Sequence, residues 1–146
     1  MAILFRIKRL LKDICMNIKF FIQRGRRGYA DIDIWDISYW FERTFIPMLK
    51  ELKDIKHGYP MTFKNEEEWD KELDKMIYYF TEMSEDECSQ KNQYSENFNK
   101  LWFSDNIDKD LQKKYLDREK EICEYREDMK NKGFELLSKY YWNLWD

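Results

Sequence analysis

The stretch ILFRIKRLLKDICMNIKFFI at residues 3–22 shows the pattern that decides the fold class. Its aliphatic and aromatic residues recur at spacings of three and four, which places them on one face of an α-helix. We predict an amphipathic helix over residues 2–23 that ends at Gly25, because a glycine can take the left-handed conformation of a helix C-cap. The apolar positions are Ile3, Leu4, Ile7, Leu10, Leu11, Ile14, Ile18, Phe21 and Ile22.

A second helix is predicted to begin at Asp33 as N-cap, with Asp36 three residues later at the positive end of the helix dipole. Pro47 lies inside this helix, and an interior proline removes one backbone hydrogen bond at a cost of about 3 kcal/mol. The apolar pattern continues in phase across Pro47, so we expect a kink there and not a break. The predicted apolar face comprises Ile34, Ile37, Phe41, Phe45, Met48, Leu52 and Ile55.

Two further helices are expected after a turn at residues 57–60. The first begins at the capping-box pair Asn65 and Glu68, and its apolar face comprises Trp69, Leu73, Met76, Ile77, Phe80 and Met83. The second covers about residues 107–143. Its first half carries Leu111, Tyr115, Ile122, Tyr125 and Met129 on one face, and its end carries Phe134, Leu136, Leu137, Tyr140, Tyr141 and Leu144 after Gly133.

Residues 84–106 are polar and rich in Asn and Ser, which predicts a mobile linker pinned by the apolar residues Leu101, Trp102 and Phe103. No strand pattern of comparable strength occurs. We therefore predict a single all-α domain over residues 1–146, an irregular bundle of four or five helices whose second helix is kinked at Pro47.

The composition of the 146-residue chain excludes several function classes. Four Gly and two Pro are too few for turn-dense all-β folds, and the phosphate-binding patterns G-x-x-x-x-G-K and G-x-G-x-x-G are absent. A single histidine and three scattered cysteines cannot build a Cys/His zinc site. The three thiols without a C-x-x-C motif suit a reducing compartment. No cofactor is expected.

Charge is unevenly distributed along the chain. Residues 1–30 carry a net charge of +7, so the remainder must carry −10 to give the total of −3. Charged residues interrupt the apolar runs, so neither a secretory signal nor a transmembrane segment is expected. Residues 1–30, the basic head, can therefore contact one of three partners: nucleic acid, an anionic membrane surface or the acidic remainder of the chain. For the apolar face of residues 2–23 we favour packing against the other helices over a membrane surface.

The segment RGRRGY at residues 24–29 is the sharpest chemical feature. The guanidinium groups of Arg24, Arg26 and Arg27 can bind phosphate with two hydrogen bonds each, and Tyr29 can stack on a base. These four residues are candidate ligands of a nucleotide or nucleic acid. The simpler alternative is that the arginines pair with carboxylates of the acidic part of the chain.

Clustered carboxylates suggest a second alternative, a magnesium site. Asp33, Asp36, Glu67 and Asp70 are its candidate ligands, because all-helical nucleotide pyrophosphohydrolases hold magnesium with an E-E-x-x-E helix. Here Lys71 or Asp70 stands where the last Glu is required. We therefore assign no catalytic residue and no metal ligand, and expect His57 to be exposed or hydrogen-bonded in its turn.

Aromatic residues exceed what one core can hold, at 18% of the chain. Three consecutive aromatic residues on one helix cannot all face inward, and such triplets occur at residues 39–41 and 140–142. Exposed Trp and Tyr side chains often anchor protein interfaces. The candidate residues for binding a protein partner, or for forming a homo-oligomer, are Trp35, Tyr39, Trp40, Tyr141, Trp142 and Trp145.

Four segments occur in the order found in a family of small, all-helical tailed-bacteriophage proteins, which the chain resembles. They are RRGYADIDIWDISYW (26–40), IPMLKELKDIKHGYP (46–60), EEEWDKELDKMIYYF (66–80) and KGFELLSKYYWNLWD (132–146). The shared features are an Asp-x-x-x-Trp helix, a Gly-Tyr-Pro turn, a Glu-Trp-Asp helix start and a Leu-Trp-Asp end. The resemblance implies a phage origin and action in the host bacterial cytoplasm, and it supplies no activity.

These observations predict a non-enzymatic phage accessory protein that binds a host or phage protein or a phosphate-bearing ligand. Interference with a host defence system is a natural use of such a protein, by analogy alone. The alternative is a metal-dependent enzyme similar to the helical nucleotide pyrophosphohydrolases.

Overall fold

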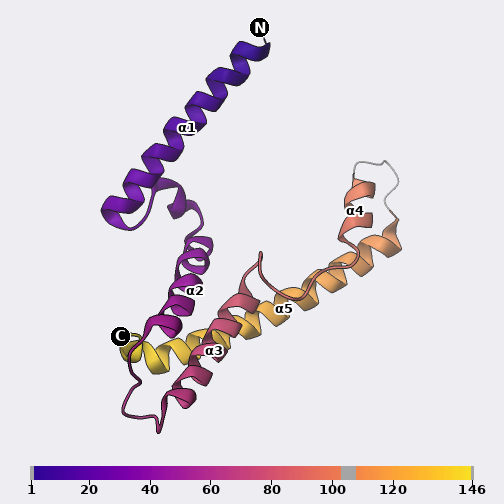
Figure 1. Cartoon of the computed structure of the whole chain (residues 1–146). Helices are drawn as coiled ribbons and strands as arrows, with labels where there is room; N and C mark the ends of the chain where they lie inside the picture. The colour runs from indigo at the N-terminus through magenta and orange to yellow at the C-terminus, as the bar shows by residue number, and fades with distance from the viewer. Residues whose placement is uncertain (1, 103–107, 146) are drawn as a thin grey trace. The chain divides into compact units, whose positions relative to one another are not determined.

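The computed structural model describes the backbone of residues 2–102 and 108–145, and the side chains of residues 6–99 and 108–145. Within these ranges all regular elements are helical (Figure 1), which confirms the predicted all-α fold with four or five helices. They are α1 (Ala2–Arg27), the 3-10 helix η1 (Asp31–Trp35), α2 (Ile37–Ile55), α3 (Glu66–Met83), α4 (Ser95–Trp102), α5 (Lys109–Tyr140) and the 3-10 helix η2 (Tyr141–Asn143). The chain divides into two compact units, residues 1–43 and 44–146.

In the first unit, α1 runs two residues past Gly25, so the predicted end at Gly25 is wrong. Gly28 has a positive φ of 82°, and its N–H donates to the carbonyl of Arg24 at 2.9 Å. Gly28 is therefore the residue that ends the helix in the left-handed conformation. Arg26 and Arg27 extend the helix because their charges complement the negative end of the helix dipole.

The start of α2 also differs from the prediction, because Asp36 and not Asp33 caps it. The Asp36 carboxylate accepts from the N–H of Tyr39 at 2.9 Å and from the hydroxyl of Ser38 at 2.7 Å. These hydrogen bonds, led by that from Ser38, lower the pKa of Asp36. Asp33 lies inside η1 and is already bound to Arg24, so it is not available as a cap.

Helix α2 is continuous through Pro47, and the kink stays a prediction. Proline has no N–H, so the carbonyl of Arg43 cannot receive the helical hydrogen bond that residue 47 would otherwise donate. The predicted apolar face holds only in part: Phe41, Phe45 and Leu52 are half-buried, and the fully buried residues of α2, Ile46 and Leu49, lie outside it. Four residues of the predicted face are exposed: Ile34, Ile37, Met48 and Ile55. Ile34 belongs to η1 and not to α2, and the buried residues of α2 lie on another side of the helix.

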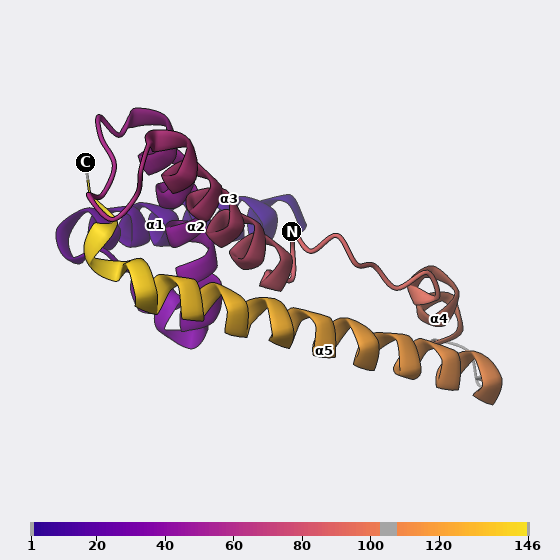
Figure 2. The ribbon, with the colours of Figure 1, turned by 90° about the horizontal axis from the view of Figure 1, so that it is seen from below.

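In the second unit, α3 packs alongside the C-terminal half of α5 (Figures 1 and 2). The predicted face of α3 is confirmed: Trp69, Leu73, Met76, Phe80 and Met83 are buried, and Ile77 is half-buried. Gly133 of α5 allows this close approach, because a Cβ at that position would lie 3.1 Å from Cε1 of Phe80. Phe45 and Phe134 meet the Phe80 ring edge to face, with centroids 5.4 and 5.3 Å away.

The N-terminus of α3 follows the predicted capping only in part. Asn65 accepts from the N–H of Glu68 at 2.9 Å, but the Glu68 carboxylate accepts from Lys64 and not from Asn65. The predicted turn is at residues 57–60. The hydrogen-bonded turn lies just after it in the chain, at Pro60–Phe63, where the N–H of Phe63 donates to the carbonyl of Pro60 at 2.9 Å.

Helix α5 begins at Lys109 after its N-cap Asp108 and ends at Tyr140. Of its predicted apolar positions, Ile122, Met129 and Tyr140 are buried. Phe134 is partly exposed although its ring contacts Phe80, and Tyr141 is exposed, as expected of an interface candidate and not of the apolar face. Residues 141–143 leave the α-helix as η2, so the predicted helix end at residue 143 is also corrected.

Residues 84–99 contact α5 at several points. The amide of Asn92 donates to the carbonyl of Tyr115 at 3.0 Å and to the carboxylate of Glu119 at 2.8 Å. The buried ring of Phe98 stacks on Tyr115 with centroids 4.1 Å apart. Mobility of residues 84–106 stays a prediction, and the side chains of Leu101, Trp102 and Phe103 lie outside the described residues.

A buried carboxylate fixes the start of this segment. Oε2 of Glu82 accepts from the N–H of Ser89 at 3.1 Å, from the Ser89 hydroxyl at 2.6 Å and from the Tyr125 hydroxyl at 2.9 Å. Burial alone would raise the pKa of Glu82, but these hydrogen bonds outweigh it and the pKa is lowered. Glu82 thereby joins α3 to both residue 89 and α5.

Candidate binding site at residues 24–40

The segment after α1 is held by an ion pair with two contacts. Nε of Arg24 donates to one carboxylate oxygen of Asp33 at 2.9 Å, and Nη2 donates to the other at 2.5 Å. The N–H of the buried residue Ala30 donates to the same carboxylate at 2.7 Å. The hydrogen bond from Arg24 is the main reason why the pKa of Asp33 is lowered. It also raises the pKa of Arg24.

Asp31 is bound by three side chains of α1. It accepts from the Gln23 amide at 2.7 Å, pairs with Lys19 at 3.0 Å, and accepts from the guanidinium of Arg27. Gln23 in turn accepts from the N–H of Asp31 at 3.0 Å. The hydrogen bonds from Gln23, Arg27 and Lys19, in that order, hold the pKa of Asp31 far below its usual range. η1 is thus fixed to the last two turns of α1.

These contacts bear on the four candidate phosphate ligands. The structure brings Arg27 over the ring of Tyr29, with its guanidinium carbon 4.5 Å from the ring centroid. Arg24 and Arg27 have carboxylate partners, whereas Arg26 is exposed and pairs with none of the described residues. This arrangement matches the simpler alternative, in which acidic residues neutralise the arginines, and the partners are Asp31 and Asp33 of the adjacent η1.

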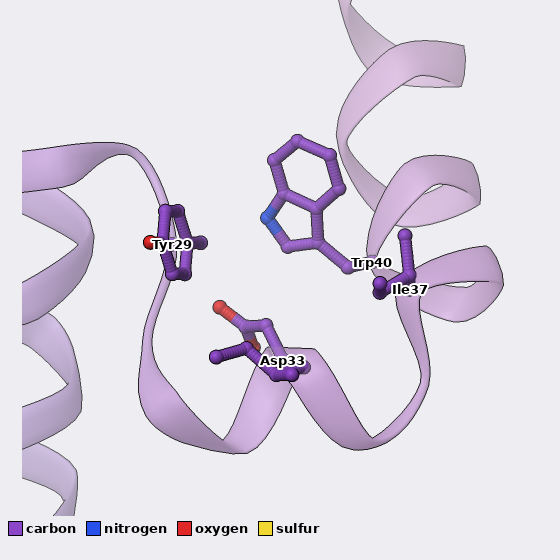
Figure 3. A pocket seen from close by; sticks show the side chains of 5 residues that line it. Tyr29, Asp33, Ile37 and Trp40 are labelled. Carbon is purple, nitrogen blue, oxygen red and sulfur yellow. The ribbon is translucent and has the colours of Figure 1, made fainter.

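An open apolar pocket of about 250 Å³ lies beside these ion pairs. Figure 3 shows Tyr29, from the loop after α1, and Trp40, from α2, on opposite sides of it, with Asp33 below them and Ile37 beside Trp40. Ile34 completes the lining. Because Asp33 is engaged by Arg24 and Ala30, the pocket offers mainly apolar surface to a ligand.

Exposed apolar side chains occur in the same segment as the pocket. The side chain of Trp35 is 88% exposed, and Ile34, Ile37 and Tyr39 are exposed as well. Sequence reasoning placed Trp35, Tyr39 and Trp40 here as interface candidates. It missed Ile34 and Ile37, which it assigned to the core. The available signal for their exposure was the pair of aspartates at positions 33 and 36. Each precedes one of these isoleucines, and such a polar segment does not favour a position in the core.

The remaining interface candidates lie at the C-terminal end of the second unit. Tyr141 and Trp142 form an edge-to-face pair with centroids 5.1 Å apart, and Trp142 is 84% exposed. Trp145 is exposed and lines a small pocket of about 90 Å³ with Gly58, Tyr59 and Pro60. The candidates therefore form two groups, one in each unit.

The candidate magnesium ligands are used for other contacts. Asp33 binds Arg24, Asp36 caps α2, and Asp70 pairs with Lys56 at 2.8 Å. Glu67 is exposed in the first turn of α3, where its charge suits the helix dipole. In the part of the chain that the structure describes, no three His, Cys, Asp or Glu side chains are grouped to hold a metal ion. His57 is exposed.

Comparison of the chain with protein-family models, with characterised proteins and with solved structures finds no match. Among the described helices, none combines the length and the apolar character needed to cross a membrane.

Proposed function

We propose that this protein acts by binding a protein partner, without catalysing a reaction, through the surface around the pocket of residues 29–40. The observation that carries the proposal is the exposure of Ile34 and Ile37 in the lining of an apolar pocket, with the exposed Trp35 next to Ile34 in the sequence. Tryptophan and tyrosine supply a large share of the binding energy at protein interfaces. The three ion pairs between η1 and α1 hold this surface in place before a partner arrives, which reduces the ordering cost of binding.

A protein partner is favoured over a phosphate-bearing ligand by the pairing of the arginines. A phosphate would have to displace Asp33 from Arg24 and Asp31 from Arg27 before it could receive their hydrogen bonds. A partner's apolar side chain needs no such exchange, because the pocket walls are the rings of Tyr29 and Trp40.

The biological setting is part of the same proposal. The four segments that resemble tailed-bacteriophage proteins support a phage origin and action in the host bacterial cytoplasm, and counter-defence rests on analogy alone. The partner is then a host protein, a phage protein or a second copy of the chain.

The test compares two exposed tryptophans. Tagged wild-type protein, Trp35→Ala, Ile37→Asp and Trp142→Ala would be used to capture proteins from infected cells, with quantification by mass spectrometry. Trp142 is the matched control, because it is exposed to a similar extent but lies in the second unit. Loss of a captured protein with Trp35→Ala and Ile37→Asp, and its retention with Trp142→Ala, would support the proposal. Equal capture by all four proteins would refute it.

Light scattering separates a second copy from other partners. If the partner is a second copy, the wild-type chain will have a mass above 18.4 kDa that falls to the monomer value in Trp35→Ala. A phosphate ligand would instead appear as nucleotide or nucleic-acid binding with a steep salt dependence, lost when Arg24, Arg26 and Arg27 are all replaced by alanine.

A further inference from the structure

Helix α1 exposes a long apolar face. Within the first unit, η1 is the described element that packs against α1, and its contacts lie near the C-terminal end of the helix. Phe21 is 77% exposed. The other exposed residues of the face are Ile7, Leu10, Leu11, Ile14, Ile18 and Ile22. Packing of this face against other helices, which the sequence favoured, is therefore not seen within this unit.

The apolar face is continuous and narrow. At about 100° per residue, the positions from Ile7 to Ile22 fall within an arc of roughly 120°. They extend over about four turns, or roughly 24 Å of helix. Met16 lies on the opposite side of the helix, about 180° from Ile7. The face is thus long enough to contact an extended surface and not just a single pocket.

Basic residues flank this face. Helix α1 carries eight basic residues and one acidic residue, Asp13. Lys8 and Lys12 lie on one side of the apolar face, and Arg6 lies along the other edge, which also holds Asp13. Lys19 and Arg24 lie on these same two sides but are paired with Asp31 and Asp33. Long basic side chains at such edges can place their charges beside a surface while their methylene groups cover it.

We propose that α1 lies along the surface of a membrane that contains anionic lipids, with its apolar face in the boundary between headgroups and acyl chains. A high amphipathicity with a basic polar side is the pattern of helices that bind this way. Arg6, Lys8 and Lys12 meet the anionic headgroups, and the many charges keep the helix on the surface. Crossing the membrane is not required, in keeping with the character of the described helices.

Charge complementarity favours this occupant over two others. A second copy of α1 would bring two helices of net charge +7 together, and the like charges at both edges would oppose their pairing. A protein groove would need acidic groups on both of its sides along four turns. An anionic lipid surface supplies negative charge on both sides at every point without a matching shape.

This inference does not rest on the proposed function, because it uses the residues of α1 and not the pocket of residues 29–40. A protein that binds a partner through Trp35 and does not bind lipid would refute only the membrane inference. Lipid binding that survives Trp35→Ala, in a protein without partners, would refute only the proposed function.

The first experiment measures vesicle binding of the full chain by flotation. Vesicles contain phosphatidylcholine alone or phosphatidylcholine with phosphatidylglycerol in a 3:1 ratio. We expect binding to the anionic vesicles, weakened by salt. Lys8→Glu/Lys12→Glu should weaken it by roughly twentyfold or more. The control Lys113→Glu/Lys120→Glu makes the same change in charge on exposed residues of α5 and should leave binding within about twofold of the wild type.

The second experiment asks which side of α1 enters the lipid. An environment-sensitive fluorophore is attached to Ile18→Cys or to Met16→Cys, in a chain whose exposed cysteines, Cys15 and Cys123, are replaced by serine. Both positions are exposed and both substitutions leave the charge unchanged. On anionic vesicles the label at position 18 should shift to the blue and be shielded from aqueous quenchers. The label at position 16 should not.

Three results would overturn the inference. They are the absence of binding to anionic vesicles, equal loss of binding in the α1 and α5 charge variants, and equal blue shifts at positions 16 and 18. Saturable binding of α1 to a protein, in a chain that does not bind vesicles, would show that a protein groove is the occupant and would also overturn it.

Discussion

The guanidinium of Arg24 meets the carboxylate of Asp33 at two points, although the two residues belong to different helices. One bond measures 2.9 Å and the other 2.5 Å. Paired hydrogen bonds of this kind fix direction as well as distance. Because Asp33 also lines the apolar pocket, the position of the pocket depends on an arginine near the end of α1.

Replacing Arg24 should loosen η1, whereas replacing Arg26 should not. Arg24→Ala removes both contacts to Asp33, and we expect amide hydrogen exchange in residues 31–35 to become roughly fivefold faster, the effect of an exposed ion pair worth about 1 kcal/mol. Arg26→Ala is the matched control, since Arg26 has no partner among the described residues. Equal exchange in the two variants would show that the ion pair does not hold η1.

Acid should release the same segment at low pH. Since the hydrogen bond from Arg24 lowers the pKa of Asp33 below its value in the unfolded chain, the charged carboxylate stabilises the folded state. This stabilisation is complete above about pH 4, the ordinary pKa of Asp, and is lost as the pH falls through the lowered pKa. The amide resonance of Ala30, whose N–H donates to Asp33, reports the titration directly by NMR. Its midpoint should lie below 3.9 in the wild type and rise in Arg24→Ala. An unchanged midpoint would contradict the assignment.

Two glycines three residues apart should respond to alanine in opposite directions. A Cβ at Gly25 or Gly28 would meet no atom within 4 Å, so the backbone conformation alone determines the effect of alanine on stability. Gly25 is helical, and Gly25→Ala should stabilise the end of α1 by up to about 1 kcal/mol. Gly28 has a φ of 82°, and Gly28→Ala should cost about 1–2 kcal/mol. Hydrogen exchange of the last turn of α1 measures both. Effects of the same sign would mean that Gly28 does not end the helix.

Alanine at Gly133 should destabilise the second unit despite its better helix propensity. The new Cβ would lie 3.1 Å from Cε1 of Phe80, a ring that is fully buried and contacted by Phe45 and Phe134. Such overpacking costs about 1–3 kcal/mol, against a propensity gain of about 1 kcal/mol. Urea denaturation of Gly133→Ala in the wild type and in Phe80→Leu forms a double-mutant cycle. The cost should shrink in Phe80→Leu, and an equal cost in both backgrounds would exclude the contact as its cause.

Glutamine at position 82 should destabilise the second unit more than glutamine at position 85. Three donors from Ser89 and Tyr125 converge on one oxygen of the buried Glu82 carboxylate. Glu82→Gln removes the charge that strengthens them, at a cost of about 1–3 kcal/mol. Glu85 is exposed, so Glu85→Gln should change the free energy of unfolding by less than about 0.5 kcal/mol. Equal effects in urea denaturation would show that the hydrogen bonds of Glu82 to Ser89 and Tyr125 do not stabilise the second unit.

The sequence predicted α3 well because its signals are local and agree. Asn65 caps the helix, and the residues at helical spacing from Trp69 to Met83 all face one core. The buried face of α2 was predicted less well, because its signals are not local. The predicted face began in η1, and no local pattern shows that Ile46 and Leu49 are the buried residues. Which of Asp33 and Asp36 caps α2 depends on Arg24, a residue outside the helix.

The sequence predicted several residues of the candidate site, but it did not predict how they contact one another. Exposure of Trp35 followed from the excess of aromatic residues. The pocket did not, because it needs the fold of η1 to bring Tyr29 opposite Trp40. The pairing of the arginines was predicted as an alternative, but the partners lie only four and nine residues away in sequence and not in a distant acidic region.

Pro47 has a consequence for the mechanics of the chain. The carbonyl that it leaves without a helical donor belongs to Arg43, the last residue of the first unit. A helical turn with one hydrogen bond fewer resists bending less than its neighbours do. This missing hydrogen bond therefore falls where the chain passes from one compact unit to the next.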